Sequence, residues 1–347
     1  MKTRNLLLAI LFLFTAFPAL SQLSDLHYLP PVYTNGRLDA ASLYVSTPSV
    51  ANVRIRVFEG DDNVPVFDGN INAANPYIQD EPIAATGLGN NTDLLIMNSI
   101  VNQVIDNDRG VRVEATAPVY AALRVRGDNE PVGFGVISSP ATGIITSKGR
   151  EALGRRFRIG SSPIHIGNAS APYFTGSNNQ ATGSNMSFYV SVMATQDNTT
   201  ITFSQHNPNM RVIRNVTNIA FQNTYNLDAG EVVTIGGRAS ASPNNEDGLI
   251  GALLTSNRDI VVNSGTATGA VPTDRNTANQ LSDFMADQLV PEENIGYEYL
   301  FARGRGNNVS EQVLVVATQN NTPIHLNGAN APAFTLNAGY FRFIENE

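Results

Sequence analysis

Residues 188–203 read FYVSVMATQDNTTITF, and this stretch decides the fold class. Apolar side chains recur at every second position from Phe188, which is the period of a β-strand. A polar Gln-Asp-Asn run interrupts the pattern, and the alternation resumes after it. Asp and Asn suit such corners because they tolerate the left-handed backbone region and bond to nearby backbone groups. The stretch therefore predicts a β-hairpin with Asn198 at its corner.

The same phrase returns later in the chain. ATQNNTP at 317–323 differs from ATQDNTT at 194–200 in two positions, and it predicts a second hairpin with Asn321 at the corner. The similarity continues downstream, because YNLDAGEVVTI matches FTLNAGYFRFI with Gly230 opposite Gly339. In both places a Leu-Asx-Ala-Gly sequence predicts a turn that leads into a strand.

Earlier segments match in the same way. ALGRRFRIG at 152–160 resembles NIGYEYLFARG at 294–304, with Gly154 opposite Gly296. TAPVYAALRVRG, which begins at Thr116, resembles NRDIVVNSGTA. The matches predict that one β unit is repeated and that the shared residues are its corners.

The repeat is domain-sized, about 120–145 residues, and therefore longer than the repeats of solenoids and propellers. Each unit should own its core, as β-sandwiches do. We expect a signal peptide at 1–21, a divergent β-sandwich-like unit at 22–186 and a clearer unit at 187–309. A third unit starts in 310–347 and is incomplete, so we expect the sequence to be part of a longer protein.

Other segments support an all-β fold. VRIRVF at 53–58 and VYAALRVRG at 119–127 alternate apolar and polar residues, whereas EQVLVVAT at 311–318 is apolar on both faces and predicts an interior strand. Short helical insertions are predicted at 91–108 and 276–289, where an Asn or Thr could cap each helix. The predicted fold class is all-β, with tandem β-sandwich-like units, short helical insertions and an incomplete last unit.

The first residues predict export. A basic start, an apolar run over 6–17 and the small residues Ala19-Leu20-Ser21 form the three parts of a signal peptide. Of the 347 residues only 15% are charged and the net charge is −8, which argues against nucleic-acid binding. The chain contains no cysteine, so it has neither disulfides nor a thiol nucleophile. We expect a secreted or outer-surface protein without a transmembrane segment after signal cleavage.

Four segments together carry a family resemblance: FYVSVMATQDNTTITF, YNLDAGEVVTI, GLIGALLTSNRDIVVNSGTATG and DQLVPEENIGYEYLFARGRG. In this order they resemble the N-terminal domain of the IgGFc-binding protein family, over roughly residues 110–347. The resemblance implies a β-rich extracellular module, named for an animal mucus protein and also found in secreted bacterial proteins. There it often belongs to gliding or surface proteins that use type IX secretion. Antibody binding does not follow from the family's name alone.

The acidic loop EGDDNVPVFDGN, residues 59–70, contains weak calcium candidates: Asp61, Asp62 and Asp68. Oxygen-rich loops can bind calcium, but this spacing is not that of an EF-hand. A solvated hairpin tip explains the loop equally well. No other cofactor is expected.

Catalytic candidates are few. Glycosidases use a pair of carboxylates, and Asp287 and Glu298 lie in the family-like segment. Carboxylates at such spacing are common in a chain with 30 acidic residues. The arginines of 149–158 could bind an anionic glycan or form a solvated rim. The sequence predicts a protein that is not an enzyme.

These observations favour an exported bacterial adhesion or binding scaffold made of repeated β domains. Its partner would be an extracellular glycan, a mucin or a protein. The alternatives are a structural spacer within a larger surface protein and, less favoured, a glycan-active hydrolase.

Overall fold

The computed structural model describes residues 22–34, 40–82, 95–97, 102–126, 142–160, 187–214, 217–238, 245, 248–269, 283–302 and 312–345. These parts are nearly all β, which confirms the predicted fold class. Short 3₁₀ turns occur at η2 (Gly149–Ala152) and η5 (Glu292–Asn294), and no α-helix lies in the described ranges. The predicted signal peptide lies outside them.

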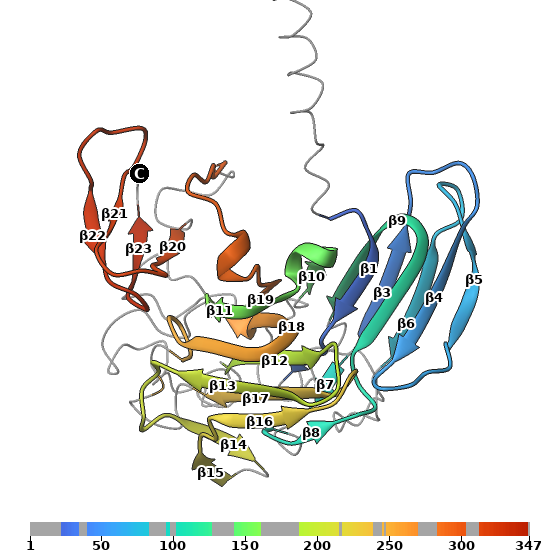
Figure 1. The fold of residues 1–347 in the computed structure, drawn as a ribbon, viewed down its shortest axis with the longest axis horizontal. Coiled ribbons are helices and arrows are strands. Elements are labelled where there is room, and N and C mark those ends of the chain that lie inside the picture. Colours follow the sequence, from blue (N-terminus) through green and yellow to red (C-terminus); the bar gives the residue numbers. More distant parts are fainter. Residues whose placement is uncertain are drawn as a thin grey trace, which may run out of the picture.

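The first sheet has seven strands, drawn mainly in blue in Figure 1. Five of them follow the order β5-β4-β9-β3-β6, and β1 and β10 also pair with β9. Their bounds are β1 (Ser24–Leu29), β3 (Ala40–Ser46), β4 (Val53–Glu59), β5 (Phe67–Ile71), β6 (Tyr77–Pro82), β9 (Val111–Arg126) and β10 (Thr142–Thr146).

The second sheet has eight strands in the order β16-β13-β18-β12-β17-β8, and β11 and β19 also pair with β18. In Figure 1 it occupies the lower half of the molecule. Its strands are β8 (Ile105–Asp106), β11 (Gly154–Arg158), β12 (Ser187–Ala194), β13 (Thr199–Ser204), β16 (Thr224–Leu227), β17 (Val232–Arg238), β18 (Leu253–Gly269) and β19 (Asp283–Gln288). It therefore takes β8 and β11 from chain segments that precede residue 187.

Seven strands of the second sheet match the seven strands of the first, and β8 is additional. β5-β4-β9-β3-β6 in the first corresponds to β16-β13-β18-β12-β17 in the second, and β1 and β10 correspond to β11 and β19. In each, one long strand holds two strand pairs together. Residues 253–256 of β18 pair with β13, and residues 260–266 pair with β12. β9 divides in the same way between β4 and β3.

A third group consists of two separate antiparallel pairs, β20–β23 and β21–β22. It stands at the left edge of Figure 1, drawn in red. The strands are β20 (Gln312–Val316), β21 (Thr322–Ile324), β22 (Phe334–Leu336) and β23 (Phe341–Glu345). We call these two pairs the third group.

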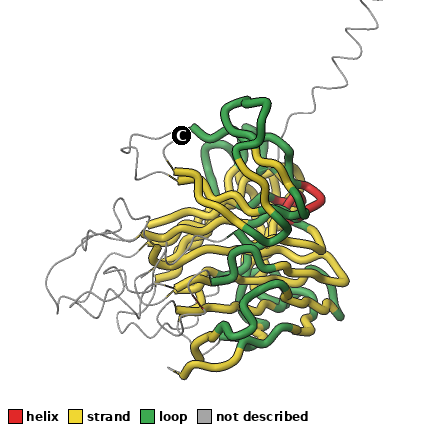
Figure 2. Tube along the Cα trace, turned by 90° about the vertical axis from the view of Figure 1, so that its left-hand side faces the viewer, coloured by secondary structure: helices red, strands yellow, loops and turns green. Residues whose placement is uncertain are grey.

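Two minor pairs complete the described strands. β2 (Val32–Thr34) and β7 (Leu95–Met97) are parallel, and β14 (Arg211–Arg214) and β15 (Thr217–Ala220) are antiparallel. Seen from the side in Figure 2, the strands stack in successive layers joined by loops.

The core follows the alternation seen in the sequence. Val53, Ile55 and Val57 are buried while the arginines between them are exposed, as predicted. One apolar cluster lies in the first sheet and also includes Tyr189 and Phe284 from the second. A separate cluster fills the second sheet. The two sheets therefore share buried surface and pack as neighbours.

Several local predictions were wrong. Residues 95–97 and 105–106 are strands and not part of a helix, and residues 283–288 form β19 where a second helix was predicted. Pairing to neighbouring strands outweighs weak helical periodicity there. β12, predicted to alternate, is buried on both faces, because Tyr189 packs into the first apolar cluster while Val190 and Val192 pack into the second. β20 was predicted to be interior, yet β23 is its one partner among the described strands.

A search of the described residues finds no helix with the length and apolarity needed to cross a membrane.

Candidate binding surface

The two predicted hairpin corners have closely similar geometry. Asn198 and Asn321 both take left-handed backbone angles, with φ of 56° and 55°. Each backbone N–H donates to an Asx side chain, to Asp228 Oδ1 at 2.9 Å and to Asn337 Oδ1 at 3.0 Å respectively. The Asx that precedes each corner returns the contact, because Asp197 Oδ1 accepts from Ala229 N at 3.1 Å. Asn320 Oδ1 accepts from Ala338 N at 3.2 Å in the same way.

The corner glycines also correspond. Gly230 and Gly339 have φ of 87° and 80°, where L side chains are strained. Gly230 N donates to Ala194 O and Gly339 N donates to Ala317 O, both at 2.9 Å. In each place the hydrogen bonds of the Asx residues therefore link the hairpin corner to the Leu-Asx-Ala-Gly turn.

Each corner also abuts the preceding group. A Cβ added at Gly230 would lie 2.3 Å from the carbonyl oxygen of Gly60, which directly follows β4 of the first sheet. A Cβ added at Gly251, just before β18, would lie 1.9 Å from the carbonyl oxygen of Gly339. Close backbone approach therefore joins the first sheet to the second, and the second sheet to the third group.

Gly154 and Gly296 have different surroundings. Gly154 lies in β11 opposite Ile260, and a Cβ there would lie 2.3 Å from Cβ of Pro291. Gly296 is exposed, and the nearest atom to an added Cβ would be the Glu298 carbonyl oxygen at 3.6 Å. Gly154 is confined by packing, whereas Gly296 is in the open.

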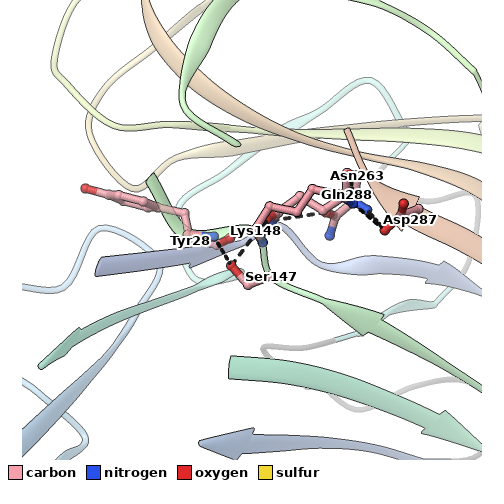
Figure 3. A network of polar contacts seen from close by, with 7 residues as sticks. Tyr28, Ser147, Lys148, Asn263, Asp287 and Gln288 are labelled. Atoms are coloured by element: carbon pink, nitrogen blue, oxygen red, sulfur yellow. Dashed lines mark hydrogen bonds and ion pairs between the residues drawn. The ribbon is translucent and has the colours of Figure 1, made fainter. Parts of the chain in front are cut away.

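A buried polar network links the first sheet to the second (Figure 3). The Gln288 side chain accepts from Lys148 N at 2.7 Å and donates to Tyr28 O at 2.8 Å. Asn263 Nδ2 donates to Pro30 O at 2.7 Å. These contacts satisfy backbone groups where β1 and β10 meet β18 and β19, so the network fixes how the sheets sit together.

His27 lies at the edge of this network. Its Nε2 is 3.0 Å from Val119 O and 3.1 Å from Ser24 O, so that nitrogen carries the proton. Nδ1 then accepts from the Ser147 hydroxyl at 3.0 Å. Burial lowers the pKa of His27, which favours the neutral ring. His27 is thus a structural residue, and sequence reasoning had no signal for it.

The arginine cluster of 149–158 is neutralised by nearby carboxylates. Arg150 pairs with Asp25 at 2.8 Å, Arg155 with Asp259 at 2.7 Å, and Arg156 with Glu292 at 2.5 Å. Arg158 is buried and donates through Nη1 to Gly251 O and Gln205 Oε1. Burial lowers the pKa of the Arg158 guanidinium, although Glu292 opposes the shift. The cluster matches a rim of ion pairs more closely than an anion site.

The carboxylates of the hydrolase alternative lie in different elements. Asp287 Oδ1 accepts from Lys148 Nζ at 2.7 Å and from Gln288 N at 2.8 Å. Glu298 lies on the exposed segment beyond η5. A surface hollow of about 410 Å³ lies beside Asp25 and Glu151, but the Asp25 carboxylate is paired with Arg150. Asp287 and Asp25 are thus each paired with a basic side chain.

The calcium candidates differ in their surroundings. Asp68 pairs with Arg54 at 2.6 Å, and the side-chain hydrogen bond to Arg54 lowers the pKa of its carboxyl. Asp61 and Asp62 are exposed at the turn that follows β4. Within the described ranges, no cluster of three or more His, Cys, Asp or Glu side chains has metal-binding geometry.

Among the described residues, a short irregular segment after η5 carries a run of exposed apolar side chains. Tyr297 is fully exposed, and Tyr299, Leu300 and Phe301 are 60%, 93% and 68% exposed. It begins at Ile295, and we call residues 295–301 the apolar segment. Clustered apolar side chains on a surface mark sites of protein association. The match between NIGYEYLFARG and ALGRRFRIG pointed to this segment in the sequence. The sequence analysis, however, used that match only to set Gly154 opposite Gly296.

Comparison with known proteins identifies one family. The family model described as IgGFc binding protein matches residues 148–346, which contain the second sheet from β11 onward, the apolar segment and the third group. No curated protein and no solved structure matches the chain.

Proposed function

Because this chain belongs to the IgGFc binding protein family, we propose that it is a non-catalytic extracellular scaffold that binds another polypeptide through its apolar segment. The family name points to a protein or glycoprotein ligand. Within the matched region, the apolar segment offers the side chains most suited to such a contact.

The observation that carries this proposal is that the charged side chains of this region are paired with one another, whereas its apolar side chains are exposed. The arginines and carboxylates around β11 and η5 bind one another. Tyr299, Leu300 and Phe301 have no such cover and lie in solvent. Tyrosine and phenylalanine are enriched at protein interfaces, where their burial supplies much of the binding energy.

The test measures binding of an immunoglobulin Fc fragment, a mucin and a glycan panel to the purified chain on a sensor surface. We expect a polypeptide ligand to bind and the L300D variant to weaken that binding by about tenfold or more, as loss of an interface hot spot does. The matched control is V50D, because Val50 is equally exposed in the loop between β3 and β4. Undiminished binding by L300D, or binding to glycans alone, would overturn the proposal.

A structural spacer is the second candidate. It is favoured by the buried contacts of Gln288 and Asn263, which tie two sheets of equal strand order into one body. We propose on the same grounds that the sheets are copies of one unit, which the sequence predicted at 22–186, 187–309 and 310–347, with β8 and β11 of the first range contributing strands to the second sheet. In that case the third group is the start of a further copy.

Export is part of the proposal. The first 21 residues have the form of a signal peptide, and the resemblance to modules of gliding bacteria supports a place on the outer surface of a bacterium. N-terminal sequencing of the secreted protein should begin at Gln22. Recovery of the intact leader from the medium would contradict signal cleavage.

A further inference from the structure

The buried hydroxyl of Ser147, directly after β10, has two acceptors within reach. Its Oγ lies 3.0 Å from His27 Nδ1 and 3.2 Å from Gln288 Oε1, and all three side chains are buried. A serine hydroxyl has one proton to donate. That proton therefore points either to His27 of β1, in the first sheet, or to Gln288 of β19, in the second sheet.

The charge on His27 decides between these two directions. While the ring is neutral with its proton on Nε2, Nδ1 is an acceptor and the Ser147 hydroxyl donates to it. Once Nδ1 carries a proton it becomes a donor, and Ser147 Oγ accepts from it. The hydroxyl proton can then turn toward Gln288 Oε1. Rotation of one hydroxyl is enough, so the heavy atoms can stay where they are.

The surroundings of the imidazole ring suit both of its states. Nε2 lies 3.0 Å from Val119 O and 3.1 Å from Ser24 O, so it donates whether the ring is neutral or charged. Gln288 Oε1 already accepts from Lys148 N at 2.7 Å, and a carbonyl oxygen has a second lone pair for the Ser147 hydroxyl. Each polar group therefore has a partner in either state, as a buried network requires.

The charged groups around His27 leave the ring in contact with neutral oxygens. Asp25, two residues earlier in β1, pairs with Arg150, and its charge favours the protonated ring. The other charged side chains nearby are paired or exposed: Lys148 with Asp287, Arg112 with Glu114, and exposed Glu151. Within the described ranges, no carboxylate is hydrogen-bonded to the ring. Burial lowers the pKa of His27, so the ring is protonated only below the usual histidine value of about 6.5.

We propose that His27, Ser147 and Gln288 form a pH-dependent hydroxyl switch at the contact between the first and second sheets. At neutral pH the Ser147 hydroxyl donates to its own sheet. In acid it donates to Gln288, whose side chain also reaches Tyr28 O at 2.8 Å (Figure 3). The switch adds one hydrogen bond between the sheets under conditions in which the buried charge weakens the fold as a whole. It does not depend on the binding role of the apolar segment.

The switch has a consequence for the proton affinity of His27. Because the hydrogen bond from Ser147 to Gln288 forms only with the charged ring, it favours protonation. Removing the acceptor at residue 288 should therefore reduce that affinity, although no hydrogen bond joins Gln288 to the ring. A side chain that only packed between the sheets would leave the affinity unchanged.

The experiment is an NMR titration of the His27 ring in the full chain, with H27N identifying its signal among those of the four histidines. Q288M should lower the proton affinity by about threefold or more, as loss of a neutral hydrogen bond does. Q288E also removes the contact with Tyr28 O, but it supplies a carboxylate oxygen and should raise the affinity by about tenfold. The control D287N should change it by less than about twofold, because that charge is largely exposed.

A second measurement isolates the hydroxyl. In an S147A background, Q288M should have no effect on the His27 ring, because the group that joins the two side chains is gone. The switch is overturned if the pKa of His27 is the same in Q288M as in the wild type, or if the Q288M effect persists in S147A. A ring that stays neutral down to the pH at which the chain unfolds also overturns it. Where Q288M does not fold, Q288E decides, and a pKa of His27 at or below the wild-type value overturns the switch.

Discussion

β12 and β20 have similar sequences and similar corners but different surroundings. β12 lies between β17 and β18 and is buried on both faces. β20 pairs with β23 alone among the described strands, and Val313–Val316 are half-exposed. Apolar composition therefore reports what a strand is suited to contact, and the partners available decide whether it does so.

The hairpin corners that follow β12 and β20, in contrast, are alike. Asn198 and Asn321 make equivalent bonds whether or not a long strand is present. Turn chemistry is local, so a hairpin can form its corner before distant strands arrive. Strand burial needs residues far away in the sequence. The variants below compare the second sheet with the third group, or with the first sheet, in order of expected effect.

The largest effect is expected from the two corner glycines. G230A should cost about 3–4 kcal/mol of unfolding free energy, because alanine is strained at positive φ and its Cβ would meet the Gly60 carbonyl. G339A should cost about 1–2 kcal/mol, since its nearest contact would be Gly251 O at 3.0 Å. Urea unfolding of both variants measures the difference. Equal costs would show that the contact with Gly60 gives way.

Gln288 tests whether the second sheet is fastened to the first by its polar network. Q288L should cost about 3 kcal/mol, because Tyr28 O and Lys148 N lose their partner in a buried place. The control D287N removes the charge of a side chain that is largely exposed, and the ion pair lost should contribute less than about 1 kcal/mol. Thermal unfolding of the two variants compares them. A Q288L protein as stable as D287N would contradict a fastening role.

The strands themselves give the next comparison. V192A in β12 should cost about 2 kcal/mol, because two buried carbon groups are removed from a packed site. V315A in β20 should cost less than about 1 kcal/mol, since Val315 is half-exposed. Urea unfolding of both variants measures the difference. Equal costs would contradict it.

The smallest effect is expected from pH, and it belongs to the first sheet. His27 in β1 occupies the position that Phe157 has in β11. The first sheet therefore has a titratable side chain at a position where the second sheet has an apolar one. Burial lowers the pKa of His27 in the folded state, and the unfolded chain therefore binds more protons at mildly acidic pH. Stability should be full above the usual histidine pKa of about 6.5 and should fall as pH drops below it. Melting curves at pH 7.5 and 5.5 should show the shift, and H27F should reduce it.

Much of the β architecture was readable from the sequence. The alternation of Val53, Ile55 and Val57 predicted which side chains are buried, because a strand's period of two is a local property. The helical prediction at 276–289 failed for the complementary reason. Residues 283–288 pair with β18, and long-range pairing outweighs weak helical preference.

The candidate surface was less accessible to sequence reasoning. NIGYEYLFARG could be matched to ALGRRFRIG, yet no local pattern tells whether Tyr299 is covered as Phe157 is. Nor does any motif announce that Arg156 and Glu292, far apart in the chain, neutralise each other. Such contacts depend on how separate segments meet.

By itself, the sequence determined the β class, the two Asx corners and the order of matching segments, because backbone preference and alternation act over a few residues. Only the tertiary structure decided that Gln288 lies buried between two sheets, that the arginines are paired, and that Leu300 is left in solvent. Burial is a property of the distant surfaces that meet a residue, and adding one long strand changes it without altering a single local preference.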